Sequence, residues 1–333
     1  GANDVSKGVA TLAGSGVARA RRAILWGTVC TVAGGLAAIA WGGALAGSFG
    51  SGLVAPGFRI DQTFLTATLL GASLWLLFAT RLGLPVSTTH ALLGGLVGAV
   101  LASAGPDGLR IAVVANKALL PLLLSPILAI LLCGGVLLVA RYVATRVPPW
   151  REGCCPREHW LGNPFVCAAA GSATPPLWQQ RLWTVLHWLS SGAASFARGL
   201  NDTPKIAAFL LLAAALVPGS ALAALGSHWP MALVALAMGA GSLWGGQRVL
   251  QVLAHRVTPM NPATGLVANT GTSLLVLTAT SFGLPVSTTH VSAGALMGIR
   301  WAGRARPVEG DALRNIILAW IVTLPVTAAL SSL

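Results

Sequence analysis

Two short motifs place an aspartate and a lysine where they could bind or balance an ion. Asn3-Asp4-x-x-Lys7 recurs as Asn201-Asp202-x-x-Lys205, 198 residues further along the chain. If these segments are helical, each aspartate lies on the same face as its lysine. Asn3 and Asn201 could supply amide oxygens to a cation or N–H donors to an anion. The alternative is that the two ion pairs neutralise themselves and only hold bent helices together.

A second repeated motif offers hydroxyl donors. Gly83-Leu84-Pro85-Val86-Ser87-Thr88-Thr89-His90 recurs without change at residues 283–290. Proline disfavours a helical residue before it, and Ser and Thr are preferred helix N-caps, so each motif predicts a chain break and then a new helix. The N–H groups of such a first turn favour anions. Together with Asn3 and Asn201, the hydroxyls of both copies suit a compact tetrahedral oxyanion: Ser87, Thr88, Thr89, Ser287, Thr288 and Thr289.

His90 and His290 end the two motifs and could relay protons or donate to the anion. The alternative is that each is a packed, hydrogen-bonded helix residue. No metal site is expected, because the thiols of Cys154, Cys155 and Cys167 lack a C-x-x-C spacing. No P-loop, serine-nucleophile or metalloprotease motif occurs, so the chain is not expected to be an enzyme.

The composition shows what kind of elements must hold these motifs. Of 333 residues, 55% are hydrophobic and 9% are charged, with eight acidic side chains in all. Soluble domains carry about 25% charged residues, so a water-soluble globule is excluded, and the apolar excess also excludes disorder. The net charge is +13, and the Lys and Arg residues lie in short clusters between apolar stretches. This distribution is typical of a membrane protein and not of a nucleic-acid-binding one.

Apolar stretches of about 20 residues predict transmembrane helices. They lie at 23–46, 62–80, 86–104, 112–140, 182–217, 230–248, 262–280, 286–303 and 312–333. Residues 1–18 form a further apolar segment that looks N-terminally incomplete. The stretch 182–217 is too long for one simple span, and its polar residues 201–205 predict a broken helix or a hairpin. Pro204 favours a helix that starts just after Asp202.

The chain is expected to contain two membrane repeats, 1–145 and 181–333, joined by a proline-rich, basic linker at 146–180. Residues 71–98 and 271–298 are identical at 17 of 28 positions, aligned without a gap. Basic loops placed in the cytoplasm let every span alternate. Five spans then separate the Asn-Asp motifs, and this odd number predicts an inverted repeat. Inverted repeats with discontinuous helices at a central site are typical of secondary transporters.

The paired Asn-Asp and Pro-Val-Ser-Thr-Thr-His motifs resemble those of the inorganic phosphate transporter (PiT) family. The resemblance covers both repeats and implies an all-helical, polytopic membrane protein that carries inorganic phosphate with Na⁺ or H⁺ by alternating access, in the cell's inner or plasma membrane. It also implies a homodimer in many members. By resemblance, Asn3, Asp4, Asn201 and Asp202 would hold the coupling cation, and the hydroxyls would hold phosphate. A sulfate or other oxyanion permease is the alternative, followed by an anion channel.

This sequence departs from the family motif at Lys7, where a second asparagine is usual, and Lys205 occupies the same place in the other repeat. Two unit charges 4 Å apart interact by about 4 kcal/mol at an effective dielectric near 20. A fixed ammonium should therefore repel Na⁺. We expect the lysines to pair with the anion or to neutralise the aspartates, and we expect proton coupling or weak Na⁺ dependence.

Overall fold

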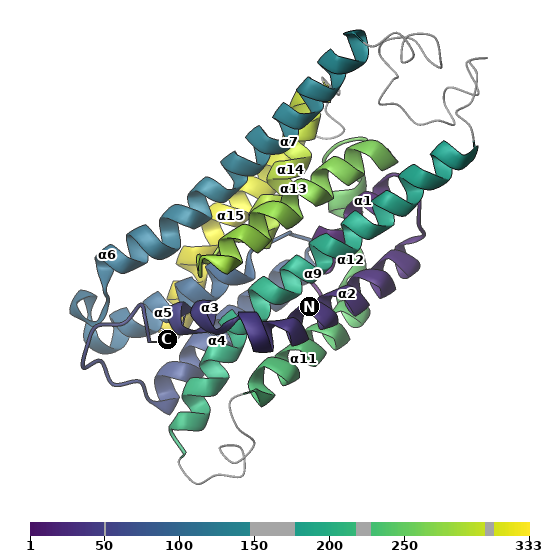
Figure 1. Cartoon of the computed structure of the whole chain (residues 1–333). Coiled ribbons are helices and arrows are strands. Elements are labelled where there is room, and N and C mark those ends of the chain that lie inside the picture. The colour runs from purple at the N-terminus through teal and green to yellow at the C-terminus, as the bar shows by residue number, and fades with distance from the viewer. Residues whose placement is uncertain (50, 147–176, 218–227, 304–309) are drawn as a thin grey trace.

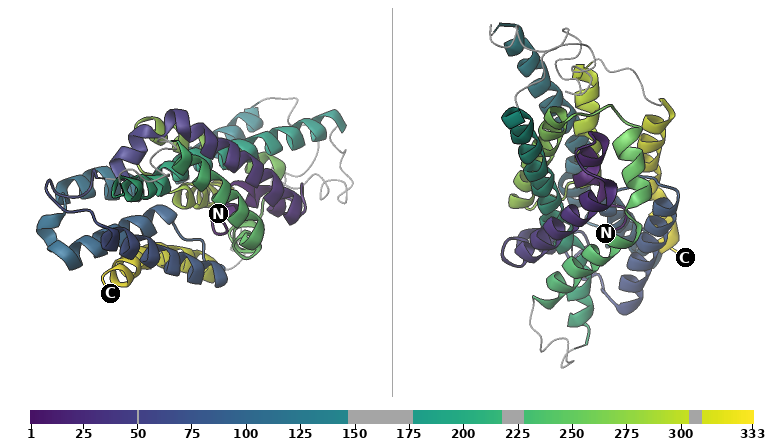
Figure 2. Two further views of the ribbon diagram at one scale, coloured as in Figure 1. Left: turned by 90° about the horizontal axis from the view of Figure 1, so that it is seen from below. Right: turned by 90° about the vertical axis from the view of Figure 1, so that its right-hand side faces the viewer.

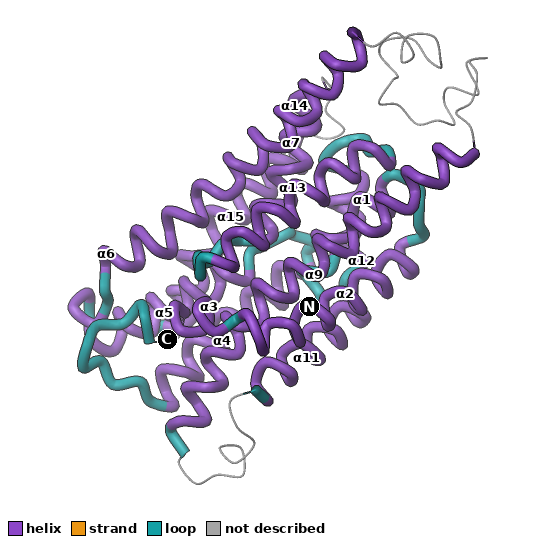
Figure 3. Tube along the Cα trace, in the orientation of Figure 1, coloured by secondary structure: helices purple, strands orange, loops and turns teal. Residues whose placement is uncertain are grey.

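Helices account for the regular structure of the described residues, apart from one isolated bridge between Val54 and Leu109. The computed structural model describes residues 1–49, 51–146, 177–217, 228–303 and 310–333. The first half holds α1 (Ser6–Gly14), α2 (Ala20–Trp41), α3 (Gly43–Phe49), α4 (Gln62–Arg81), α5 (Thr88–Ala104), η1 (Pro106–Gly108), α6 (Ile111–Val113), η2 (Val114–Leu119) and α7 (Leu120–Arg146). The second holds α9 (Leu177–Ala215), α11 (Trp229–Gly245), α12 (Gln247–His255), α13 (Pro262–Ser281), α14 (Thr288–Gly303) and α15 (Gly310–Ser331). The all-helical prediction is confirmed for this part of the chain (Figure 3).

The long helices run in roughly one direction through an elongated bundle, as Figures 1 and 2 show. Each of the nine predicted spans contains helix. Within the described residues, four helical stretches are long and apolar enough to cross a membrane: Ala20–Trp41, Gln62–Arg81, Ile111–Val143 and Leu313–Ser331. Large apolar side chains on these stretches, such as Leu25, Leu123 and Ile321, are more than half exposed. So much exposed apolar surface fits a bundle that lies in lipid.

The first Gly-Leu-Pro motif ends one helix inside the bundle and prepares the next. α4 ends at Arg81, and Gly83 then turns the chain with a φ of 74°, which only glycine adopts readily. The Leu84 amide donates to the Ala79 carbonyl at 2.9 Å, which closes the helix end as a Schellman-type turn. α5 begins at Thr88. The predicted chain break is confirmed.

The second copy of the motif makes the same break. α13 ends at Ser281, and Gly283 turns the chain with a φ of 65°. The Leu284 amide donates to the Ala279 carbonyl at 2.9 Å, and α14 begins at Thr288. Identical local sequence therefore builds identical local structure at both places.

The stretch around Asn201 folds differently from the prediction. Leu177–Ala215 forms a single α-helix of 39 residues, with Pro204 inside it, so the predicted helix start after Asp202 and the predicted interruption at 201–205 are both wrong. Pro204 lacks a backbone N–H, so it removes only one hydrogen bond from the backbone of α9. The polar side chains of this turn find partners on neighbouring segments, so the backbone does not have to open for them.

The helix that follows each repeated motif packs against helices of both halves of the chain. α5 packs against α4 of its own half and against α15 of the other half, while α14 packs against α13 and against α7. Each motif helix thus lies between its own half and the final long helix of the other. The predicted linker falls mainly on residues 147–176, outside the described ranges, as do Cys154, Cys155 and Cys167. The opposite orientation of the repeats stays a prediction.

Candidate functional site

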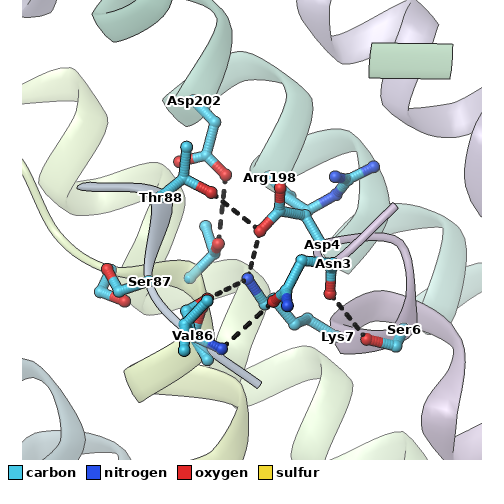
Figure 4. A network of polar contacts seen from close by, with 12 residues as sticks. Asn3, Asp4, Ser6, Lys7, Val86, Ser87, Thr88, Arg198 and Asp202 are labelled. Carbon is cyan, nitrogen blue, oxygen red and sulfur yellow. Dashed lines mark hydrogen bonds and ion pairs between the residues drawn. The ribbon is translucent and has the colours of Figure 1, made fainter. Parts of the chain in front are cut away.

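Asp4 is the centre of the first half of a buried polar network (Figure 4). The Lys7 ammonium contacts its carboxylate as an ion pair and also donates to the Val86 carbonyl at 3.0 Å. The Thr88 hydroxyl donates to the same carboxylate oxygen at 3.0 Å. The Val86 amide donates to the Asn3 side-chain oxygen at 3.2 Å. The first Asn-Asp motif is therefore bonded directly to the first chain break.

Asp202 is the centre of an equivalent network from the second half. Its carboxylate lies 3.2 Å from the Lys205 ammonium, which also donates to the Val286 carbonyl at 2.8 Å. The Thr288 hydroxyl donates to the other carboxylate oxygen at 3.2 Å. The Asn201 amide donates to the Asp202 carboxylate at 3.0 Å and to the Val286 carbonyl at 3.2 Å. The second Asn-Asp motif is thus held to the second break by the same kinds of contact.

Hydroxyl groups join the two networks into one. The Thr89 hydroxyl donates to the Val286 carbonyl at 3.3 Å, and the Thr289 hydroxyl donates to the Val86 carbonyl at 2.9 Å. The Lys205 ammonium also donates to the Thr89 hydroxyl at 2.8 Å. Each break therefore receives a bond from the threonine of the other break, and residues about 200 positions apart share one site.

All side chains that the sequence placed in the site are buried, with relative exposures of 9% or less: Asn3, Asp4, Lys7, Ser87, Thr88, Thr89, His90, Asn201, Asp202, Lys205, Ser287, Thr288, Thr289 and His290. A carboxylate in the centre of a bilayer costs about 2.5–3.5 kcal/mol even on an insertion scale. Here each carboxylate has a lysine and a hydroxyl within hydrogen-bonding distance, which offsets that cost.

The two predicted capping serines do cap their helices. The Ser87 side-chain oxygen accepts from the His90 amide at 3.1 Å, and the Ser287 oxygen accepts from the His290 amide at 3.2 Å. Each hydroxyl keeps its own proton for donation to another group. The structure places these serines at the helix starts where the sequence predicted them.

The two histidines meet where the motif helices approach each other. The ring centroids of His90 and His290 lie 4.4 Å apart, and the His290 ring lies 4.1 Å from that of Trp320. The Nδ1 atom of His290 lies 3.5 Å from the Leu122 carbonyl. The two imidazoles therefore form one buried pair, although their positions in the chain are 200 residues apart.

Sequence reasoning missed one charged residue beside this network, Arg198 (Figure 4). It lies in α9, one helical turn before Asn201 and Asp202, and its relative exposure is 1%. Arg198 lies inside the apolar stretch 182–217, three and four residues before Asn201 and Asp202. In a helix this spacing places it on the same face as that pair, so the sequence could have indicated it as a site residue.

Comparison with known families settles the class of this protein. The model of the phosphate transporter family matches residues 1–331, which is nearly the whole chain. This chain belongs to the phosphate transporter family. The membership confirms the resemblance that the paired motifs indicated, and the chain is a multi-pass membrane protein.

Curated relatives of this family member match it over nearly its whole length. A protein of Rhizobium meliloti (strain 1021) described as a "probable low-affinity inorganic phosphate transporter" is 29% identical over 336 residues, which cover 100% of this chain and 90% of the relative. A protein of Mycobacterium tuberculosis (strain CDC 1551 / Oshkosh) with the same description is 28% identical over 326 residues, 98% of this chain and 70% of the relative.

A solved structure has the fold of this family member. It is named "The sodium-dependent phosphate transporter" and superposes with a TM-score of 0.78 at 23% sequence identity, over 99% of this chain and 93% of that one. At this level of identity the match establishes the shared fold. The helical architecture predicted from the sequence is therefore that of a solved membrane transporter.

Proposed function

We propose that this chain is a symporter that moves inorganic phosphate across the membrane by alternating access. The observation that carries the proposal is the single buried network formed by both Asn-Asp motifs and both chain breaks. Secondary transporters place substrate and coupling-ion sites where their repeats meet, near the bilayer midplane. Movement of one helical group past the other would expose a shared site of this kind to each side in turn.

The phosphate ligands in this proposal are neutral donors from both halves. Hydroxyls of Ser87, Thr88 and Thr89, with their counterparts Ser287, Thr288 and Thr289, surround the two breaks, and Asn3 and Asn201 add amide N–H groups. Four of the six hydroxyls donate to a carboxylate or a carbonyl in this structure. Hydroxyl rotation could redirect such a donor to a phosphate oxygen without moving the backbone.

The positions of the two lysine ammonium groups favour proton coupling or weak Na⁺ dependence of transport. The Lys205 ammonium lies among a carboxylate oxygen at 3.2 Å, the Val286 carbonyl at 2.8 Å and the Thr89 hydroxyl at 2.8 Å. Hard cations bind oxygen ligands of these types, so the ammonium fills a place that suits a metal cation. Na⁺ beside it would meet a like charge in the protein interior. We propose that Lys7 and Lys205 act as tethered cations, and that His90 and His290 carry the coupled proton.

Uptake into proteoliposomes tests the proposal. Purified protein is reconstituted, and uptake of labelled phosphate is measured with an inward Na⁺ gradient and an inward proton gradient imposed separately. We expect saturable uptake that responds to the proton gradient and little to Na⁺. Strong, saturable Na⁺ dependence without a proton response would overturn the coupling proposal. Unlabelled sulfate should leave phosphate uptake intact, and its complete inhibition would instead indicate a sulfate permease.

A further inference from the structure

Arg198 is buried in the bundle with most of its charged group unpaired. It is among the largest fully buried side chains, with a relative exposure of 1%. Its Nη2 atom donates to the Thr31 hydroxyl of α2. Its Nε and Nη1 atoms have no hydrogen-bond partner among the described residues. A buried charged donor without a partner is unfavourable, so this group needs an acceptor that the described residues do not supply.

The nearby carboxylates are already engaged with other groups. Asp4 pairs with Lys7, and Asp202 pairs with Lys205. Neither carboxylate forms an ion pair with Arg198 among the described contacts. The described charged side chains at the centre are therefore three bases, Lys7, Arg198 and Lys205, and two acids, Asp4 and Asp202.

The other titratable groups add no negative charge. His90 and His290 are neutral or cationic. The buried site therefore has one more basic than acidic side chain, and a bound anion would offset that surplus.

We propose that Arg198 binds the transported oxyanion through its unpaired guanidinium nitrogens. This inference rests on the proposed phosphate transport and adds the charged ligand that a set of neutral hydroxyls lacks. The guanidinium group offers five N–H donors and forms strong, charge-assisted bonds with phosphate oxygens. It keeps its charge in a buried site, so the anion meets a fixed cation at any physiological pH.

A purely structural role for Arg198 makes a different prediction. A tether between α9 and α2 uses only Nη2 and the Thr31 hydroxyl, which also donates to the Ser195 carbonyl at 3.3 Å. Such a tether leaves Nε and Nη1 unexplained. Thr31→Val removes the tether and keeps the arginine, so it is the matched control.

The experiment measures equilibrium binding of inorganic phosphate to purified full-length protein, with proteoliposome uptake alongside. Variants are Arg198→Gln, Arg198→Lys and Thr31→Val. We expect Arg198→Gln to raise the Kd for phosphate by about tenfold or more, because it removes charge-assisted hydrogen bonds. Arg198→Lys should raise it by a smaller factor, and Thr31→Val should stay within about twofold of the unmodified protein.

Two results would overturn the inference: an Arg198→Gln variant with an unchanged Kd, or equal losses in Arg198→Gln and Thr31→Val. If the Arg198→Gln variant does not fold, the Arg198→Lys variant tests the inference instead. A Kd for phosphate that is unchanged in Arg198→Lys would exclude recognition by the guanidinium group. Failure of the unmodified protein to bind or take up phosphate would instead count against the proposed function. The two failures are therefore distinguishable.

Discussion

At the scale of single residues, the site depends on two internal ion pairs, Asp4–Lys7 and Asp202–Lys205, whose carboxylates also accept hydrogen bonds from neutral donors. Asp202 meets Lys205, Thr288 and the Asn201 amide within 3.2 Å. Such a pair repays its desolvation only when the geometry is good and the remaining hydrogen-bonding capacity is used. The hydroxyl and amide contacts supply that condition. The pairs should therefore be sensitive to loss of one partner and more tolerant of loss of both.

Asp202→Asn should reduce the stability of the protein by about 3–5 kcal/mol, because it leaves the Lys205 ammonium buried without its counter-charge. The double variant Asp202→Asn/Lys205→Met should be more stable than the single variant, since it leaves no isolated charge. Thermal or chemical unfolding in detergent measures both. Asp311→Asn is the control, because its pair with Arg314 lies on the surface. A double variant less stable than Asp202→Asn would contradict the argument.

Lys205→Asn, alone or with Lys7→Asn, should increase the Na⁺ dependence of phosphate uptake. The substitution removes the tethered ammonium and leaves the Asp202 carboxylate, the Val286 carbonyl and the Thr89 hydroxyl around a vacated cation position. Uptake at a series of Na⁺ concentrations measures the effect. The exposed Lys117 gives the matched control, Lys117→Asn, which should leave the Na⁺ response unchanged. Intact transport with an unaltered cation response in the Lys205 variant would count against tethered cations.

At the scale of helices, close packing brings the motif helices to the long helices of the other half. Gly98 of α5 lies so close to α15 that a Cβ atom there would stand 2.0 Å from the Ala328 carbonyl oxygen. Gly294 of α14 meets α7 in the same manner, 2.6 Å from the Pro126 carbonyl oxygen. Small residues let helix backbones approach in membranes, and these contacts position Thr88 and Thr288 at the site.

Gly98→Ala should therefore destabilise the protein by about 1–3 kcal/mol, the usual cost of overpacking, and should lower the yield of active transporter. Gly135→Ala in α7 is the matched control, because a Cβ atom there would meet nothing within 4 Å. That change should be neutral or stabilise the helix by up to about 1 kcal/mol. Unfolding midpoints in detergent compare the two. Equal midpoints for both variants would show that α5 and α15 can separate without cost.

At the scale of the whole molecule, the two halves form one site through reciprocal contacts. Thr89 donates to Val286 of the other break, and Thr289 donates to Val86. Each motif helix also packs against a helix of the other half. Neither half completes the site alone, so a change in the relative position of the halves would change both parts of the network together.

The inverted repeat predicts which faces of the membrane equivalent loops reach. Arg59 and Pro259 are exposed and lie 200 residues apart, at equivalent places in the two repeats. In a background without the five native cysteines, Arg59→Cys and Pro259→Cys should react with a membrane-impermeant thiol reagent from opposite sides. Labelling of intact cells and of inverted vesicles measures the sidedness. Reaction of both cysteines from the same side would rule out the inverted arrangement.

The amino-acid sequence was sufficient for the features that depend on local rules. The Gly-Leu-Pro-Val-Ser segments end one helix and cap the next through bonds that span no more than six residues, such as His90 to Ser87 and Leu84 to Ala79. The apolar runs predicted helices because a chain in lipid must satisfy its backbone internally. The exact recurrence of both motifs indicated one shared site and the phosphate transporter family.

Tertiary structure decided the features that depend on partners far away in the chain. α9 stays helical through Pro204 because Asn201, Asp202 and Lys205 find their partners on other segments, and no local signal shows those partners. The pairing of His90 with His290 and the unpaired nitrogens of Arg198 likewise arise only when α5, α9 and α14 come together. The sequence specifies which polar groups are present, and packing determines which of them find a partner within the described residues.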